Sequence, residues 1–126
     1  MVKRTKYSGP CALEATLAVF GSKWKPALLF HLYENGACRH GELRRLIPEV
    51  SQRIMTQQLR ELERDGLVLR KDFREVPPRV EYSATELAQT LKPLFVSIEK
   101  WGKEQIKNVE AARKRYDKMN NKEQSE

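Results

Sequence analysis

Cysteine is scarce in this sequence, and long apolar runs are missing. The two cysteines, Cys11 and Cys38, are too few for a disulfide framework, which agrees with a reducing compartment. Residues 1–6 are basic but lead into no apolar stretch of the kind a signal peptide needs, and the apolar run at 27–30 stops at His31. We therefore expect a cytoplasmic chain that does not enter a membrane.

Histidine is equally scarce, and the usual patterns of catalytic sites are absent. Besides His31 and His40 there is no histidine, and neither a glycine-rich phosphate loop nor a catalytic triad follows from the spacing. Cys38 and His40 would share one face of a strand, as metal ligands sometimes do, but no second pair of ligands exists. A core cysteine beside a polar histidine is the favoured interpretation, so we expect no enzyme, no cofactor and no metal.

What the chain has instead is positive charge. Its 126 residues suit one domain, and 24 Lys and Arg against 17 Asp and Glu give a formal net charge of +7. This balance favours a polyanionic partner such as nucleic acid. Basic and acidic residues are mixed along the whole chain, so only helical spacing can separate them into a binding face.

Apolar spacing predicts two helices in the first part of the chain. Leu13, Leu17 and Phe20 fall on one side of a helix that begins near residue 11. Ser22 is expected to cap a second helix, and a short extended segment, 37–39, is expected after it. The second helix has four apolar positions: Leu28, Leu29, Leu32 and Tyr33.

A short helix and a longer one are predicted next. The short helix covers residues 40–47, with three residues expected on its buried side: Leu43, Leu46 and Ile47. Ser51 is a strong N-cap for the longer helix, and Gly66 suits the position after its C-terminus. The buried stripe of this helix is Met55, Leu59 and Leu62. The opposite face, at about 100° per residue, carries Arg53, Thr56, Gln57, Arg60 and Arg64.

Two helices joined by a tight turn, the second exposing such side chains, have the form of a helix-turn-helix. Arginine can bind guanine O6 and N7, glutamine can bind adenine N6 and N7, and a threonine methyl can contact the thymine methyl. The alternative is an ordinary solvated helix face. Such faces usually mix Glu with Lys, and this one contains no acid, so DNA reading is favoured.

The segment after the longer helix has the pattern of a hairpin. Leu67, Leu69 and Phe73 alternate with polar residues, residues 75–78 cannot continue a strand, and alternation returns at 79–82. A hairpin behind a recognition helix is a wing, whose cations could pair with phosphates or enter a minor groove. The cations flanking its tip are Arg70, Lys71, Arg74 and Arg79.

A last helix is predicted from Thr85. Its stripe, with Phe95 beside it, consists of Leu87, Leu91, Leu94, Ile98 and Trp101. This is more apolar surface than a small core covers, and pairing with a second copy is the simplest explanation. Beyond Gly102 the chain is charged and helix-prone, and residues 120–126 are expected to be a frayed tail.

Five stretches of the chain match the pattern of a known family: 11–16 (CALEAT), 21–26 (GSKWKP), 41–45 (GELRR), 51–63 (SQRIMTQQLRELE) and 75–82 (EVPPRVEY). On these stretches the sequence resembles the HxlR-type winged helix-turn-helix regulators of bacteria. The resemblance implies a mainly α-helical fold with a small β-hairpin, and a homodimer held by the first and last helices. His40 departs from the pattern, because the family usually has an aromatic residue there, and Glu49 replaces a frequent turn glycine.

The expected organisation is an N-terminal arm (1–10), the winged helix-turn-helix domain (11–102), and a charged helical extension with a tail (103–126). We expect a transcription regulator that binds an inverted repeat of double-stranded DNA. The candidate DNA-binding residues are Arg44, Arg45, Ser51, Gln52, Arg53, Thr56, Gln57, Arg60, Arg74 and Arg79. The candidate dimer-interface residues are Leu13, Leu17, Leu91, Leu94, Phe95, Ile98 and Trp101.

Two further hypotheses concern regulation and an alternative function. Cys11 lies at a predicted helix start, whose unpaired N–H groups stabilise a thiolate, and several regulators of the resembled family respond to oxidants or electrophiles through a cysteine in this position. Cys11 is thus a candidate sensor of an oxidant or small-molecule effector, with inert packing as the alternative. The alternative to a specific regulator is a basic architectural or RNA-binding protein, although no exposed aromatic cluster is evident.

Overall fold

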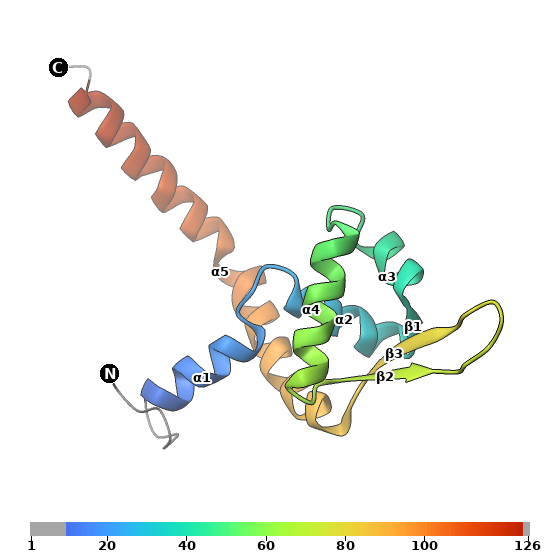
Figure 1. The fold of residues 1–126 in the computed structure, drawn as a ribbon. Coiled ribbons are helices and arrows are strands. Elements are labelled where there is room, and N and C mark those ends of the chain that lie inside the picture. Colours follow the sequence, from blue (N-terminus) through green and yellow to red (C-terminus); the bar gives the residue numbers. More distant parts are fainter. Residues whose placement is uncertain (1–9, 125–126) are drawn as a thin grey trace, which may run out of the picture. The chain divides into compact units, whose positions relative to one another are not determined.

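The computed structural model describes residues 10–124 of the chain. Of these, residues 10–91 belong to one compact unit and residues 92–124 to a second. The elements follow one another (Figure 1) as α1 (Pro10–Phe20), α2 (Lys25–Asn35), β1 (Cys38–Arg39), α3 (His40–Leu46), α4 (Gln52–Arg64), β2 (Val68–Asp72), β3 (Val80–Ala84) and α5 (Glu86–Gln124). The expected arm of residues 1–10 lies outside the described residues, except for Pro10, which begins α1.

The core of the first unit is built on the buried side of α4. Its three residues at this side, Met55, Leu59 and Leu62, are at most 1% exposed, as the sequence predicts. α4 packs against α2 and β2. α2 contributes three further buried leucines, Leu28, Leu29 and Leu32. Burying each such side chain stabilises the fold by about 1.5–3 kcal/mol, so the apolar stripe determines which face of α4 remains at the surface.

The strands form a three-stranded antiparallel sheet in the order β1-β3-β2. β2 and β3 make the predicted hairpin, with Val68 opposite Ala84 at its base. β1 is the expected extended segment after α2, and it adds a third strand by placing Cys38 opposite Tyr82. The sequence did not predict this pairing, because the two strands are separated by α3 and α4.

The end of α4 sets the register of β2. Gly66 has φ of 79°, its N–H donates to Glu63 O (3.0 Å), and the N–H of Leu67 donates to Leu62 O (2.9 Å). This pair of hydrogen bonds is a Schellman motif. Leu67 therefore belongs to the helix end and is buried, and the inward face of the strand begins with Val68. The expected alternation of Leu67 with Leu69 is wrong, since Leu69 is 56% exposed.

Three further boundaries or faces differ from expectation. α2 begins at Lys25, because residues 22–24 form a turn in which Ser22 Oγ accepts a hydrogen bond from the Lys25 N–H (3.2 Å). Leu46 is 41% exposed rather than buried, because α3 ends there and Ile47, already outside the helix, turns into the core instead. The residues expected to fray, 120–124, continue α5, and residues 125–126 lie outside the described part.

Gly66→Ala is expected to lower the free energy of unfolding by about 1–2 kcal/mol. An added Cβ would meet only Leu87 Cδ2 at 3.6 Å, an ordinary contact, so the cost arises from the positive φ of 79°. Gly41→Ala is the matched control, because its Cβ would meet nothing within 4 Å and it lies in α3, where alanine is the better helix former. Thermal denaturation of both variants checks this, and equal losses of stability would contradict the explanation.

The second unit consists of α5 from Lys92 onward. Several large apolar side chains of this part are exposed: Leu94, Val96, Ile98, Trp101, Ile106, Tyr116 and Met119. In the first unit α1 also exposes Leu13 (62%) and Leu17 (49%). Within residues 10–124 no helix combines the length and the apolar character needed to cross a bilayer.

Candidate nucleic-acid interface

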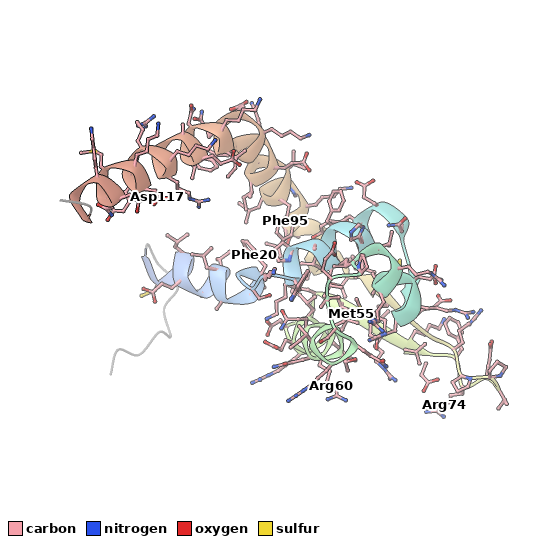
Figure 2. All side chains as sticks on the ribbon, turned by 90° about the horizontal axis from the view of Figure 1, so that it is seen from above. Phe20, Met55, Arg60, Arg74, Phe95 and Asp117 are labelled. Atoms are coloured by element: carbon pink, nitrogen blue, oxygen red, sulfur yellow. The ribbon has the colours of Figure 1, made fainter. Side chains whose placement is uncertain are left out.

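The outer face of α4 carries the polar side chains that the sequence predicts there. Arg53, Gln57 and Arg60 are exposed, and Thr56 is half-buried between them. Together with Gln52 they line one surface hollow. Figure 2 shows Arg60 pointing away from the core, on the side of α4 opposite Met55. The face lacks acidic residues, so its donors and positive charge are available to a polyanion.

The basic surface continues from α4 to the sheet. A second hollow is lined by Thr56, Arg60, Glu63, Arg70 and Tyr82, and it shares its first two residues with the hollow on α4. Arg70 lies on β2 and is exposed. The sequence indicates only that Arg70 flanks the wing, because the packing of β2 beside α4 is not visible in it.

The candidates on α3 and at the start of α4 have separate environments. Ser51 caps α4, and its Oγ accepts a hydrogen bond from the Ile54 N–H (3.2 Å). Arg45 is exposed but lines a different hollow, with Cys38, Leu46 and others. The structure therefore does not bring Arg45 into the hollows on α4, although it remains an exposed cation on the preceding helix.

The two arginines expected to act from the wing differ in their surroundings. Arg74 is exposed near the tip of the hairpin (Figure 2), with φ of 54° and its N–H donating to Asp72 Oδ1 (2.8 Å). The Arg79 guanidinium lies 3.6 Å from the centre of the Phe73 ring. It also lies within 4 Å of Glu75 and Glu81. Arg79 therefore stabilises the hairpin itself, and Arg74 is the better placed of the two to contact a phosphate.

His40 contacts the outer face of α4 and was missed as a functional residue. Its Nε2 lies 3.0 Å from Thr56 Oγ1. Burial, and next the charge of Arg44, lower the pKa of His40, which favours the neutral form of its ring. The sequence signalled only that a polar residue stands where the resembled family usually has an aromatic one.

An ion pair between a buried lysine of α2 and a partly exposed glutamate of α4 was also missed. Lys25 is 5% exposed, and its Nζ lies 3.1 Å from Glu61 Oε1. Gln58 Nε2 donates to Glu61 Oε2 (3.3 Å), and Ser22 Oγ donates to Gln58 Oε1 (2.6 Å). These four side chains connect the start of α2 to the middle of α4, and they fix the direction in which the outer face of α4 points.

The two cysteines have different environments. Cys11 lies in the first turn of α1 and is half-buried. Cys38 is 2% exposed, and its Sγ donates to Gly36 O (3.5 Å). Burial raises the pKa of the Cys38 thiol, and the charges of Glu42 and Glu81 raise it further. Among residues 10–124 no three His, Cys, Asp or Glu side chains lie together as metal ligands would.

The helices α2, α3 and α4, followed by the β2–β3 hairpin, define a winged helix-turn-helix, a class of DNA-binding protein. The family model of HxlR-like helix-turn-helix proteins matches residues 19–110. YdeP of Bacillus subtilis (strain 168), described as an uncharacterized HTH-type transcriptional regulator, is 48% identical over 112 residues, which are 86% of this chain and 87% of YdeP. The chain therefore belongs to the HxlR-like helix-turn-helix family. Its matched relatives are transcription regulators rather than enzymes.

Solved structures agree with this assignment. The redox regulator HypR in its reduced form has a TM-score of 0.75 at 44% sequence identity, covering 79% of this chain and 98% of HypR. The reduced form of the transcriptional regulator YodB from B. subtilis has a TM-score of 0.65 at 29% identity, covering 75% of this chain and 91% of YodB. The resemblance and the fold class predicted from the sequence are confirmed.

Proposed function

We propose that this transcription regulator binds a specific inverted-repeat operator as a homodimer. The observation that carries the proposal is the outer face of α4, where Arg53, Gln57 and Arg60 are exposed together without an acid. Arginine and glutamine are the side chains that make bidentate contacts with guanine and adenine in the major groove. Arg74 on the hairpin supplies a phosphate contact beside this face.

The dimer part of the proposal is supported by exposed apolar side chains. Leu13 and Leu17 on α1, and Leu94, Ile98 and Trp101 on α5, are each at least 39% exposed. Leu91 and Phe95 of α5 are half-buried and complete the expected set. A two-fold dimer covers such surfaces and places two recognition helices on half-sites about 10 bp apart.

The regulatory part of the proposal concerns Cys11. HypR is named a redox regulator, and this chain carries a half-buried cysteine in the first turn of α1. The first turn of a helix has unpaired N–H groups that stabilise a thiolate. We infer that an oxidant or electrophile reacts at Cys11 and alters DNA binding through α1.

Changes on α4 and changes on the wing are expected to act differently on DNA binding. Arg53→Ala, Gln57→Ala and Arg60→Ala should each weaken binding to an enriched DNA site by about 1–3 kcal/mol and alter the base preference. Arg74→Ala should weaken binding to the enriched site and to random DNA alike. It should also reduce the slope of log K against log salt by about 1. Titrations of both DNAs at several salt concentrations check this.

Two outcomes of these titrations, and one outcome of a mass measurement on the complex, would contradict parts of the proposal. Indistinguishable specificity profiles for α4 and wing variants would refute the division between base reading and phosphate contact. Equal affinity of the wild type for enriched and random DNA, or for RNA, would favour the architectural or RNA-binding alternative. A complex with one chain per DNA, measured by its mass, would refute the homodimer.

A further inference from the structure

The Thr56 hydroxyl, at the centre of the α4 face, is held from two sides. Its Oγ1 lies 2.9 Å from Gln52 O, one turn earlier in the same helix. It also lies 3.0 Å from Nε2 of His40, which begins α3. Two different elements, α3 and α4, therefore fix one small side chain on the surface that is proposed above to bind DNA.

Counting protons shows what this hydroxyl can offer to a base. A threonine hydroxyl has one proton and two lone pairs. If the proton goes to Gln52 O, His40 donates its own Nε2 proton to Oγ1. If the proton goes to Nε2 instead, it is again used within the protein. In both arrangements Thr56 has no proton left for an acceptor such as guanine O6 or thymine O4.

Oγ1 keeps at least one lone pair, which can accept a hydrogen bond from adenine N6 or cytosine N4, and the only group of Thr56 that can contact thymine favourably is its methyl. Threonine in a helix divides between two rotamers, and a hydrogen bond from Oγ1 to the carbonyl four residues earlier selects one of them. The contact with His40 holds the same rotamer from outside the helix. Thr56 lines both the hollow with Arg53 and the hollow with Arg70, so it lies where the two parts of the basic surface meet.

We propose that His40 is a positioning residue that locks Thr56 as a methyl reader, which selects thymine by contact with its C5 methyl group. The inference rests on the operator binding proposed above and deepens it by assigning one base. The locked hydroxyl disfavours guanine at this position, because guanine offers acceptors to a donor that Thr56 lacks.

The first test uses DNA in which single thymines are replaced by deoxyuridine, which differs by that methyl group alone. Sites are first enriched from a random duplex library with the wild-type protein. Replacing one symmetric pair of thymines should weaken binding by about threefold to fivefold per methyl. Thr56→Val, which keeps a methyl, should retain this preference for thymine over uracil, whereas Thr56→Ser should lose it at that pair only.

The second test concerns His40 and uses a double-mutant cycle. His40→Ala should lower the thymine-to-uracil ratio at the same pair, because the freed hydroxyl can rotate, and it should raise the affinity for guanine there relative to thymine. In the Thr56→Val background His40→Ala should leave the ratio unchanged, since no hydroxyl remains to be held. Each ratio compares two DNAs with one protein preparation, so a smaller folded fraction does not alter it.

The outcomes separate this inference from the proposed function. An enriched site without a uracil-sensitive pair that depends on Thr56, or equal behaviour of Thr56→Val and Thr56→Ser, overturns the methyl reader. An effect of His40→Ala that persists in the Thr56→Val background overturns the role of His40. Failure of the library to yield any preferred sequence refutes the specific operator itself, and the inference with it.

Discussion

Replacing Glu61 with alanine is expected to lower the free energy of unfolding by about 3 kcal/mol, which corresponds to roughly 10–20 °C in Tm. Lys25 is 5% exposed, and Glu61 Oε1, 3.1 Å from its Nζ, neutralises it. Removing the carboxylate leaves a charged ammonium in the core without its partner. The Glu61 side chain is 43% exposed, so water entering the gap keeps the cost at the lower end for a broken buried pair.

The reverse substitution should be much milder. Lys25→Met keeps the length of the apolar stem and leaves Glu61, whose side chain is 43% exposed, free to be hydrated, so we expect a loss of about 1 kcal/mol or less. Glu63→Ala, at an exposed position on the same helix, is the control for a lost carboxylate. Chemical denaturation of the three variants measures the difference. Equal costs for Glu61→Ala and Lys25→Met would show that the loss does not arise from a buried Lys25 ammonium left without its partner.

The parts of the fold that depend on local sequence could be predicted. Ser51 marks the start of α4 and Gly66 marks its end. Each can be recognised from one residue, because a cap needs a side-chain hydroxyl and a positive φ favours glycine. The inward turn of Met55 and Leu59 follows from helical spacing alone. Once one face of α4 is buried, the side chains of the opposite face are determined, and the candidate DNA-reading residues were found in this way.

The parts that were missed depend on contacts between residues distant in sequence. Lys25 and Glu61 are 36 positions apart, and nothing in the local pattern of either indicates burial of a charge. His40 reaches Thr56 across 16 positions and through the turn between two helices. Leu69 was assigned to the wrong face because the Schellman motif uses Leu67 for the helix end, which shifts the inward face of β2 by one residue.

The two cysteines should differ in their rate of reaction with an electrophile such as benzoquinone by at least about a hundredfold. The thiolate is the reacting form, and its sulfur bonds to a ring carbon as the quinone becomes a hydroquinone. Cys38 is 2% exposed, and its raised pKa keeps it a thiol at neutral pH, so it reacts only when β1 opens. Cys11 is half-buried in the first turn of α1. Peptide mass spectrometry over a time course measures both rates, and the rate at Cys38 should rise with pH.

If Cys11 is the sensor, its modification should change operator affinity by about 5-fold to 150-fold, the usual range of coupling between two sites. The change in affinity should occur in the wild type and in Cys38→Ser, because the buried Cys38 is not the cysteine that reacts. It should be absent in Cys11→Ser. Binding to the enriched site is measured for the three proteins before and after treatment with the quinone or with diamide, and again after a thiol reductant in the case of diamide. If all three proteins lose or keep their affinity for the enriched site alike, Cys11 is not a switch. Coupling through α1 requires that Cys11, the only cysteine of this helix, carry the modification.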